Sequence, residues 1–543
     1  MSASIRWNQD IPHRSRARRR WMQADAPFAL LALLLSCGTG SPPAQEPGWT
    51  EHEPARSTRR VYLSSSTGND TNDGLTPDSP KATIPAATRL LRTGNPDWLL
   101  IKRGDEFRSG LGEWVRSGGS KCAPMVVTSY GNGSARPLFR CGVDDGLTMH
   151  TTAIHDVAFV GLHFVADAYD GGNGHPYGIS LLSPCTRVLI EDCKIERFGT
   201  NIRFQGADHR NLELRRSVIA DAFTTGKAHS QGIYVEALTG CLIEECVFDH
   251  NGWRPSVDGA VPTIFRHNIY VQGDTKKVVI RGNVIARGGS HGLQARSGGV
   301  IRDNLFLANS ISLLVGSTTG NDGALQASVI GNVMLDGRDI DAAEPRGWAA
   351  QFQCLASGEI AYNVAAHQVS GTAPLCFEFN SKAGAGINNV DFHHNVSYRW
   401  GGGVSLSGTH FSAFEFRDNE LQDSGSSALI RADSESPLAG ISTANNRLHT
   451  GAPAGAWMFF NGRQLSLPAW KTLVADDTSV AQQVAYKNAD ETIAEYDRAT
   501  GGSGSLDSFL ARVRNQSRAN WNDRLVGTNV AAHFRGNFGV VVP

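Results

Sequence analysis

One short pattern recurs through most of this 543-residue chain. A run of apolar residues is followed by one small or polar residue, and the same position returns at intervals of 21 to 37 residues. A repeat of this size is typical of a solenoid, in which every repeat forms one coil that stacks on the previous coil. The recurring position is filled by His163, Cys193, Ser217, Cys246, Asn283, Asn304, Asn332, Asn363, Asn395, Asn419 and Asn446.

Asparagine dominates this position from Asn283 onward, and its chemistry explains why. Stacked, inward-pointing asparagine side chains can bond to one another and to the backbone at a bend. Small side chains fit the same inward slot, so Cys193 and Cys246 are predicted to be ladder members and not reactive thiols. Cys122 and Cys141 flank two strand-like runs, and we expect them to form a disulfide if the chain reaches an oxidising compartment.

A second strand-like segment follows each ladder segment and alternates with period two. Its inward residues are predicted to be Ile179, Ile202, Ile233, Ile269 and Leu293. Its outward residues form a first column of Ser180, Arg203, Tyr234, Tyr270, Gln294, Leu314, Gln351, Glu378 and Ser405. Two residues further on, a second column contains Gln205, Glu236, Gln272, Arg296, Gln353 and Asn380. Because stacked strands lie about 4.8 Å apart, each column brings distant residues side by side.

These repeats, together with the segments 61–88, 98–107, 465–474 and 505–521, resemble those of a known group of proteins. They are similar to the right-handed parallel β-helix of extracellular carbohydrate-active proteins, especially polysaccharide lyases and uronan epimerases. The resemblance implies an all-β solenoid of about 10 to 12 coils. We expect a helix near 85–92 to cap the first coil, and short helices at 505–514 and 526–534 to pack on the solenoid or cap its other end.

The N-terminal residues have the features of a targeting segment. An arginine-rich region precedes the apolar run 26–35, which is too short to span a membrane, and Leu34-Leu35-Ser36-Cys37 resembles a bacterial lipobox. We therefore expect export to the cell envelope and lipidation at Cys37, which would anchor the protein to the outer membrane. An ordinary secretory signal cut near Gly38 is the alternative.

The chain is accordingly divided into five parts: a signal peptide (1–37), a flexible tether (38–58), an N-terminal lead-in and cap (59–145), the parallel β-helix (146–460) and a C-terminal segment with short helices (461–543). The formal net charge of −1 provides no basic excess for binding nucleic acid. We expect a monomer whose partner is a polysaccharide.

A dense polar patch is predicted where three histidines precede consecutive outward segments. Removing a proton beside a uronate carboxylate requires a base, an acid for the leaving oxygen, and a cation or hydrogen-bond donors that offset the developing charge. A histidine suits the base, a tyrosine the acid and an arginine the offsetting charge. The catalytic candidates are His267, His291, Tyr270, Tyr234 and Arg296, and the substrate-binding candidates are Arg203, His229, Glu236, Gln272, Gln294, Trp253 and Arg254.

The sequence therefore favours a lyase that cleaves an acidic polysaccharide by β-elimination, in an exopolysaccharide pathway or in nutrient uptake. A C5-epimerase stays open, although "HGLQAR" lacks the Asp-Pro-His motif of mannuronan epimerases of this fold. A glycoside hydrolase needs two carboxylates about 5–10 Å apart. In the outward columns only Glu236 and Glu378 are acidic, so a partner would come from a loop residue such as Asp170, Asp221 or Asp258.

Two further possibilities concern binding without chemistry. A surface lipoprotein that only binds glycan would need stacking aromatic residues and few titrating groups, whereas the three histidines favour catalysis. The sequence predicts no definite cofactor. Asn69, Asp70, Asn72 and Asp73 form a turn that could hold a calcium ion, although such turns also form without metal.

Overall fold

The computed structural model describes residues 48–543 except 173, 318–324, 340–345, 370–374, 382–384, 424–427 and 434–435. The chain divides into two compact units, residues 1–48 and 49–543. Cys37, the predicted signal peptide and most of the predicted tether lie outside the described residues. Within the described part, no helix is both long enough and apolar enough to cross a membrane.

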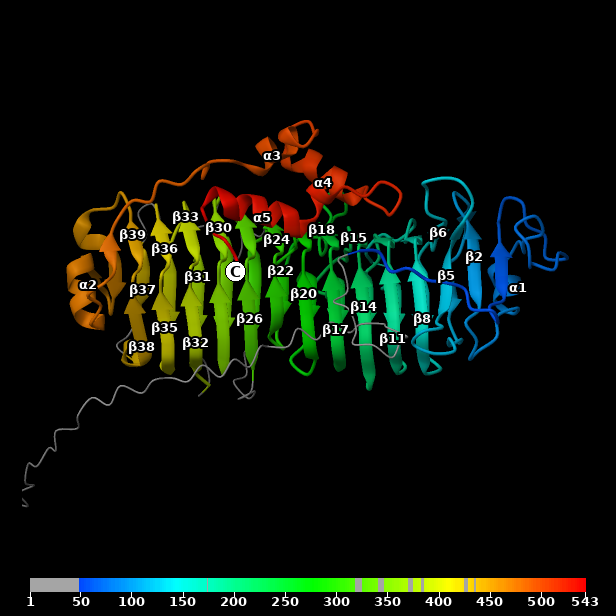
Figure 1. Ribbon diagram of the computed structural model, residues 1–543, viewed down its shortest axis with the longest axis horizontal. Coiled ribbons are helices and arrows are strands. Elements are labelled where there is room, and N and C mark those ends of the chain that lie inside the picture. The colour runs from blue at the N-terminus through cyan, green and yellow to red at the C-terminus, as the bar shows by residue number, and fades with distance from the viewer. Residues whose placement is uncertain are drawn as a thin grey trace, which may run out of the picture. The chain divides into compact units, whose positions relative to one another are not determined.

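The second unit is a right-handed parallel β-helix of about 12 turns, as the sequence predicted. Each coil adds one short strand to each of three sheets, and each sheet contains 14 strands within the described residues. The coils follow one another along the solenoid in chain order, as the colour gradient of Figure 1 shows. Parallel pairing begins with β1 (Arg60–Leu63) and β2 (Trp98–Lys102), inside the segment treated above as lead-in and cap.

The first sheet runs from β1 to β38 (Ile441–Ala444), and the third from β3 (Glu106–Phe107) to β42 (Val480–Ala481). The second sheet carries the predicted outward columns. Its strands are β4 (Gly112–Glu113), β7 (Leu147–Met149), β10 (Tyr177–Leu181), β13 (Thr200–Phe204), β16 (Ser230–Val235), β19 (Arg266–Val271), β22 (His291–Ala295), β25 (Ile311–Gly316), β28 (Trp348–Gln353), β31 (Phe377–Asn380), β34 (Val404–Ser407), β37 (Ile430–Ala432), β40 (Met458–Phe460) and β41 (Arg463–Leu465).

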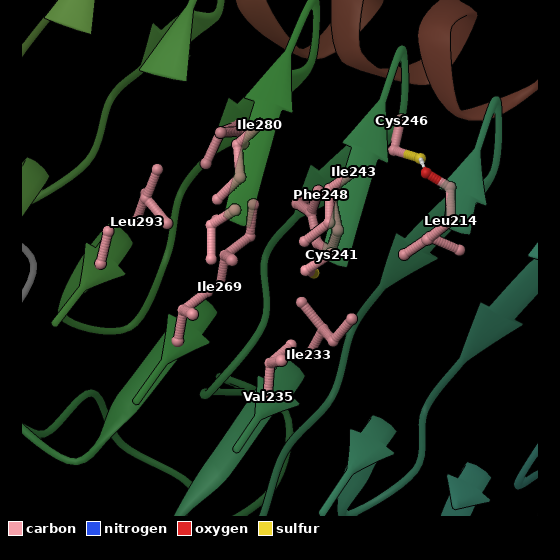
Figure 2. Close-up of a cluster of buried hydrophobic side chains, with 14 of the residues drawn as sticks. Leu214, Ile233, Val235, Cys241, Ile243, Cys246, Phe248, Ile269, Ile280 and Leu293 are labelled. Atoms are coloured by element: carbon pink, nitrogen blue, oxygen red, sulfur yellow. Dashed lines mark hydrogen bonds between the residues drawn. The ribbon is translucent and has the colours of Figure 1, made fainter. Parts of the chain in front are cut away.

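The inner faces of the three sheets form one apolar core. All five predicted inward residues of the second sheet are fully buried. Figure 2 shows Ile233, Ile269 and Leu293 of this sheet pointing toward Ile243 and Ile280 of the first. Burial of these side chains supplies most of the driving force for folding, at about 25 cal/mol per Å² of apolar surface.

The predicted asparagine ladder lines one inner corner of the solenoid. Asn283 Nδ2 donates to Asn304 Oδ1 at 2.8 Å and to the Ile243 carbonyl at 3.1 Å. The backbone N–H of Asn283 donates to the same Asn304 oxygen at 3.0 Å. The pattern repeats from coil to coil through Asn446, whose amide ends the ladder on Ser479 Oγ. Each buried amide is therefore satisfied while it fixes the register of two coils.

Cysteine occupies the same slot in earlier coils, as predicted. The backbone N–H of Cys193 donates to Ser217 Oγ and that of Cys246 to Asn283 Oδ1. Cys246 Sγ donates to the Leu214 carbonyl (Figure 2). Burial raises the pKa of the Cys193 thiol to about 12, so this sulfur is inert as a nucleophile.

Two sequence predictions are wrong, one about a disulfide and one about a residue of the ladder. Cys141 is buried and carries a free thiol, which donates to the Phe139 carbonyl, so the expected Cys122–Cys141 disulfide does not form. His163 pairs in register with Lys194, one residue beyond the ladder slot, which Leu162 fills instead. A slip of one residue turns a side chain to the opposite face, and the imidazole of His163 accordingly contacts Glu196 outside the core.

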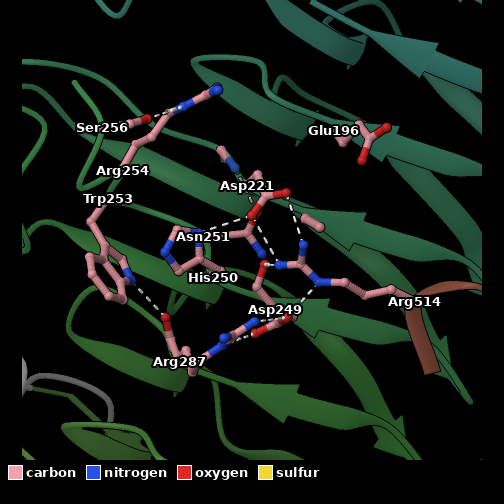
Figure 3. Close-up of polar contacts among 12 residues, drawn as sticks. Glu196, Asp221, Asp249, His250, Asn251, Trp253, Arg254, Ser256, Arg287 and Arg514 are labelled. Atoms are coloured by element: carbon pink, nitrogen blue, oxygen red, sulfur yellow. Dashed lines mark hydrogen bonds and ion pairs between the residues drawn. The ribbon is translucent and has the colours of Figure 1, made fainter. Parts of the chain in front are cut away.

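Short helices cap the ends and one side of the solenoid. The helix α1 (Ile84–Thr88) is shorter than predicted and begins at Thr83, whose hydroxyl accepts the Ala86 N–H. The tail contains α2 (Leu467–Val474), α3 (Ile493–Ala499), α4 (Leu506–Arg514) and α5 (Gly527–Asn537). Helices α4 and α5 cover the apolar outer face of the third sheet (Figure 1). Arg514 of α4 reaches Asp221 and Asp249, which anchors the tail (Figure 3).

The ladder leads to a stability prediction. Asn332→Ala removes the bonds to the Ile301 carbonyl and to Asn363. It also takes away the acceptor of the buried Asn304 backbone N–H and leaves the Asn304 side-chain amide with the Ile280 carbonyl alone. Because unsatisfied buried polar groups are costly, we expect a loss of about 3 kcal/mol. Urea unfolding followed by circular dichroism measures it, with the outward-facing Ser328→Ala as control. Equal midpoints for the two variants would show that the ladder does not stabilise the coils.

Candidate functional site

The first outward column of the second sheet has the predicted register. Arg203 pairs with Tyr234, Tyr234 with Tyr270, and Tyr270 with Gln294. On the same face, Gln231 pairs with His267 and His267 with His291. Parallel stacking therefore brings residues as far apart in the chain as Arg203 and Gln294, which are 91 positions apart, onto four adjacent coils.

His267 lies at the centre of this patch and is almost completely buried. Its Nδ1–H donates to Gln231 Oε1 at 2.9 Å. The side-chain amide of Gln294 is oriented so that its nitrogen donates to His267 Nε2 at 2.8 Å while its oxygen accepts from Arg296 Nε at 3.0 Å. Burial, reinforced by the positive charges nearby, lowers the pKa of His267 to about 3. This imidazole is therefore neutral, and both of its nitrogens are occupied.

His291 lies on the next coil, with its ring 4.9 Å from that of His267. Its Nδ1 bonds to Ser290 Oγ at 2.9 Å, and within the described residues its Nε2 has no hydrogen bond. Burial and the neighbouring His267, Arg346 and Arg296 lower its pKa well below the ordinary value. His291 is therefore a neutral imidazole with one nitrogen available to a ligand.

Two tyrosines complete the centre of the patch. The Tyr270 ring lies 4.9 Å from His267 and 5.5 Å from Tyr234. The Tyr234 hydroxyl donates to Glu236 Oε2 at 2.9 Å and accepts from Gln272 Nε2 at 3.2 Å. Burial raises the pKa of Tyr234, and the hydrogen bond to Glu236 raises it further. The Tyr270 hydroxyl, in contrast, has no hydrogen-bond partner in the described part of the chain.

Two arginines on this face meet no acidic partner among the described residues. The Arg296 guanidinium is held by Gln294, by Gln353 Oε1 at 3.3 Å and by the Gly316 carbonyl at 3.4 Å. The Arg203 guanidinium lies 3.6 Å from the centre of the Tyr177 ring and donates to Ser180 Oγ. No carboxylate of the described residues pairs with either. Each partly exposed guanidinium therefore presents positive charge that an anionic ligand can neutralise.

The second column supports the patch from one edge. Gln205 Nε2 donates to Glu236 Oε2 at 2.7 Å, the same oxygen that accepts from Tyr234. Glu236 and Gln272 therefore orient Tyr234, which had been predicted as a catalytic group. These contacts occupy the Tyr234 hydroxyl and leave Tyr270 as the tyrosine that is open to a substrate.

Trp253 and Arg254 are not brought to this centre by any contact of the described residues. The Trp253 ring packs 4.3 Å from His250, and its Nε1 donates to the Arg287 carbonyl at 2.9 Å (Figure 3). Arg254 donates to Ser256 Oγ and lies over the Phe223 ring. His229, by contrast, is exposed at the edge of the patch, where its ring lies 5.1 Å from Phe265.

The sequence analysis missed Arg266, which organises the loops beside the patch. This fully buried arginine donates to the carbonyls of Gly226, Ala228, Gly252 and Val261. No carboxylate of the described residues neutralises it, and burial lowers its pKa. Arg266 thereby ties the loop 224–228 to the loop 252–265, and we call this pair of loops the loop wall. Its position directly before His267 was the only signal in the sequence.

The structure gives little support to a glycoside hydrolase, which would need two neighbouring carboxylates. Glu236 and Glu378 lie five coils apart, roughly 24 Å. Asp221 is bound to Arg514 and His250 beneath the C-terminal helices.

At the proposed calcium turn, the carboxylate of Asp70 accepts bonds from Ala82 and Thr83, and the ammonium of Lys81 donates to the backbone of Asp70 and Asn72. The described residues contain no group of three or more metal-binding side chains.

Comparison with known proteins defines the class of fold. A family profile described as "Right handed beta helix region" matches residues 169–333. No curated protein matches the sequence significantly. Among solved structures, a mannuronic acid specific polysaccharide family 6 lyase enzyme from human gut microbiota shares 13% identity over 84% of this chain and 98% of that one, with a TM-score of 0.50.

Other solved structures are more distant in geometry. A GH136 lacto-N-biosidase from Eubacterium ramulus shares 15% identity over 78% of this chain and 67% of that one, with a TM-score of 0.30. A pectate lyase shares 13% identity over 76% and 82%, with a TM-score of 0.32. At these identities the similarity concerns the fold alone, since one fold hosts many chemistries.

The buried imidazole of His267 leads to a prediction of pH dependence. The unfolded chain binds a proton near pH 6.5, whereas the folded chain keeps this ring neutral down to about pH 3. Acid therefore protonates the unfolded state first, and stability falls as the pH decreases from about 6.5 toward 3. His267 should account for a loss of about 2 kcal/mol between pH 7 and pH 5.

Urea unfolding at pH 7 and pH 5 tests this. His267→Gln should reduce the difference between the two pH values, and the exposed His410→Gln should leave it unchanged. If the pH difference of His267→Gln equals that of the unmodified protein, His267 is not the buried neutral group described here.

Proposed function

We propose that this protein is a polysaccharide lyase that cleaves a uronate-containing polymer by β-elimination on the second sheet. The observation that carries the proposal is a pair of arginines, Arg203 and Arg296, that meet no carboxylate of the described residues. They lie on a face that also carries neutral imidazoles and an open tyrosine hydroxyl. A polymer with carboxylates along its length complements such a face, because it supplies the negative charge that the protein does not.

Arg296 is assigned to the carboxylate of the sugar that reacts. When the proton on the carbon next to that carboxylate is removed, negative charge spreads into the carboxylate oxygens. A guanidinium fixed in advance by Gln294 and Gln353 stabilises this charge without having to reorganise. The neutral His267 holds Gln294 in the orientation that this task requires, so we assign His267 a positioning role.

His291 is assigned as the base and Tyr270 as the acid. His291 Nε2 takes the proton, the electron pair of the broken C–H bond forms a carbon–carbon double bond, and the neighbouring carbon–oxygen bond breaks. The leaving oxygen takes the hydroxyl proton of Tyr270. Burial is the main cause that lowers the pKa of His291, and nearby positive charges add to it. A substrate carboxylate beside Arg296 offsets the contribution of those charges and makes this imidazole a stronger base.

Substitution in the patch tests these roles with a panel of uronan polymers and the ultraviolet absorbance of the unsaturated product. We expect Arg296→Gln, Tyr270→Phe and His291→Ala each to lower kcat/KM by about 100-fold, because each removes a group that acts in the transition state. Arg431→Gln is the matched control, since Arg431 continues the same column but pairs with Asp433.

Other outcomes would replace the proposal. New reducing ends without this absorbance would indicate hydrolysis, and a changed sugar configuration at constant chain length would indicate epimerisation. Full activity in all three patch variants would move the site elsewhere. Retention of a polymer without any reaction would favour the glycan-binding alternative.

We further propose that the protein is exported and anchored to the outer membrane through a lipid on Cys37. The support is the lipobox-like Leu34-Leu35-Ser36-Cys37 after an arginine-rich and then apolar segment. A labelled fatty acid should be incorporated into the protein expressed in a Gram-negative host and should be absent from Cys37→Ser. Equal labelling of both proteins, or no labelling of either, would exclude this anchor.

A further inference from the structure

The loop wall carries three exposed apolar side chains beside the polar face. Within a stretch of five residues, the side chains of Val261, Ile264 and Phe265 are 56%, 38% and 41% exposed. Phe265 is the only phenylalanine among the exposed large apolar side chains of the described residues. Single exposed apolar side chains scattered over a surface need no explanation, whereas several on one loop beside a polar face suggest a binding surface.

Phe265 is exposed and yet held in place. Its carbonyl accepts from Gln231 Nε2 at 2.9 Å, and its ring rests 5.1 Å from His229 on the neighbouring coil. The next residue, Arg266, ties the loop wall together through backbone carbonyls. An aromatic ring that is already ordered loses little entropy when a ligand covers it.

The same amide connects this ring to the centre of the patch. Gln231 donates to the Phe265 carbonyl, and its Oε1 accepts from the backbone N–H and from Nδ1 of His267, at 2.8 Å and 2.9 Å. Gln231 and His267 pair in register on neighbouring strands. Two residues before each of them, His229 and Phe265 therefore also lie side by side. The aromatic surface is therefore fixed relative to His267 and, through it, to the neighbouring Tyr270.

We propose that Phe265, backed by His229, stacks against the pyranose ring of a sugar unit adjacent to the unit that reacts. A pyranose presents an apolar face of C–H groups and directs its hydroxyls outward. An exposed phenyl ring buries that apolar face and leaves the hydroxyls hydrated. The inference rests on the proposed function for its ligand class, a polysaccharide, and makes Phe265 the stacking residue in place of Trp253, whose ring is packed on His250.

Kinetics on the full chain with the uronan that it cleaves test the stacking. Phe265→Ala and Phe265→Leu should raise KM about 3- to 10-fold at unchanged kcat, in line with the energy of an aromatic contact. Phe265→Tyr should restore the KM, since it keeps the ring. Leu75→Ala, which removes an equally exposed apolar side chain (45%) near the N-terminal end, is the control.

Two results would overturn the inference. A KM for Phe265→Ala equal to that of Leu75→Ala would show that no sugar covers this ring. A KM for Phe265→Leu equal to that of the unmodified protein would show that apolar volume, and not an aromatic face, is what matters.

Affinity electrophoresis in gels containing each polysaccharide separates this inference from the proposed function. Retention that weakens in Phe265→Ala, without any unsaturated product, would support stacking and reject β-elimination. Unsaturated product with unchanged retention and KM in Phe265→Ala would support β-elimination and reject stacking. If no polysaccharide is cleaved or retained by the unmodified protein, both are rejected.

Discussion

The structure depends on the in-register stacking of parallel coils. A residue on one coil lies about 4.8 Å from its counterpart on the next, so any feature that repeats in the sequence becomes a continuous line in space. The asparagine ladder enforces this register from inside, because each amide bonds to the amide of the following coil. A slip of one residue would expose the core residues and break every ladder bond at that coil.

The polar face shows how such a scaffold can place ordinary residues in unusual surroundings. Stacking buries His267 and His291 among other side chains and near guanidinium groups, which keeps both imidazoles neutral. Among the described residues, the same face leaves Arg203 and Arg296 without acidic partners, whereas many other arginines form ion pairs, such as Arg514 with Asp221 and Asp249. Unbalanced charge on an otherwise satisfied surface is a feature that proteins retain at functional sites.

The sequence predicted the columns correctly and the loops poorly, for one physical reason. Period-two alternation and the ladder asparagines specify which way a strand residue faces, so the neighbours of Tyr234 and Tyr270 could be predicted before any coordinates. A loop has no such period. Trp253 was expected to bind substrate, but its indole nitrogen donates to the Arg287 carbonyl, away from the centre of the patch. The sequence does not reveal the place of Phe265, because nothing in it shows that the buried Arg266 holds this loop beside the patch.

The sequence by itself determined the coiling, the buried ladder and the membership of the outward columns, because these follow from local alternation repeated many times. Only the tertiary structure decided which members of the patch are available for chemistry. His267 and Tyr234 are engaged by neighbouring amides and a carboxylate, whereas His291 and Tyr270 keep an open polar atom. That distinction arises from hydrogen bonds between side chains on different coils, and these form only after the coils have stacked.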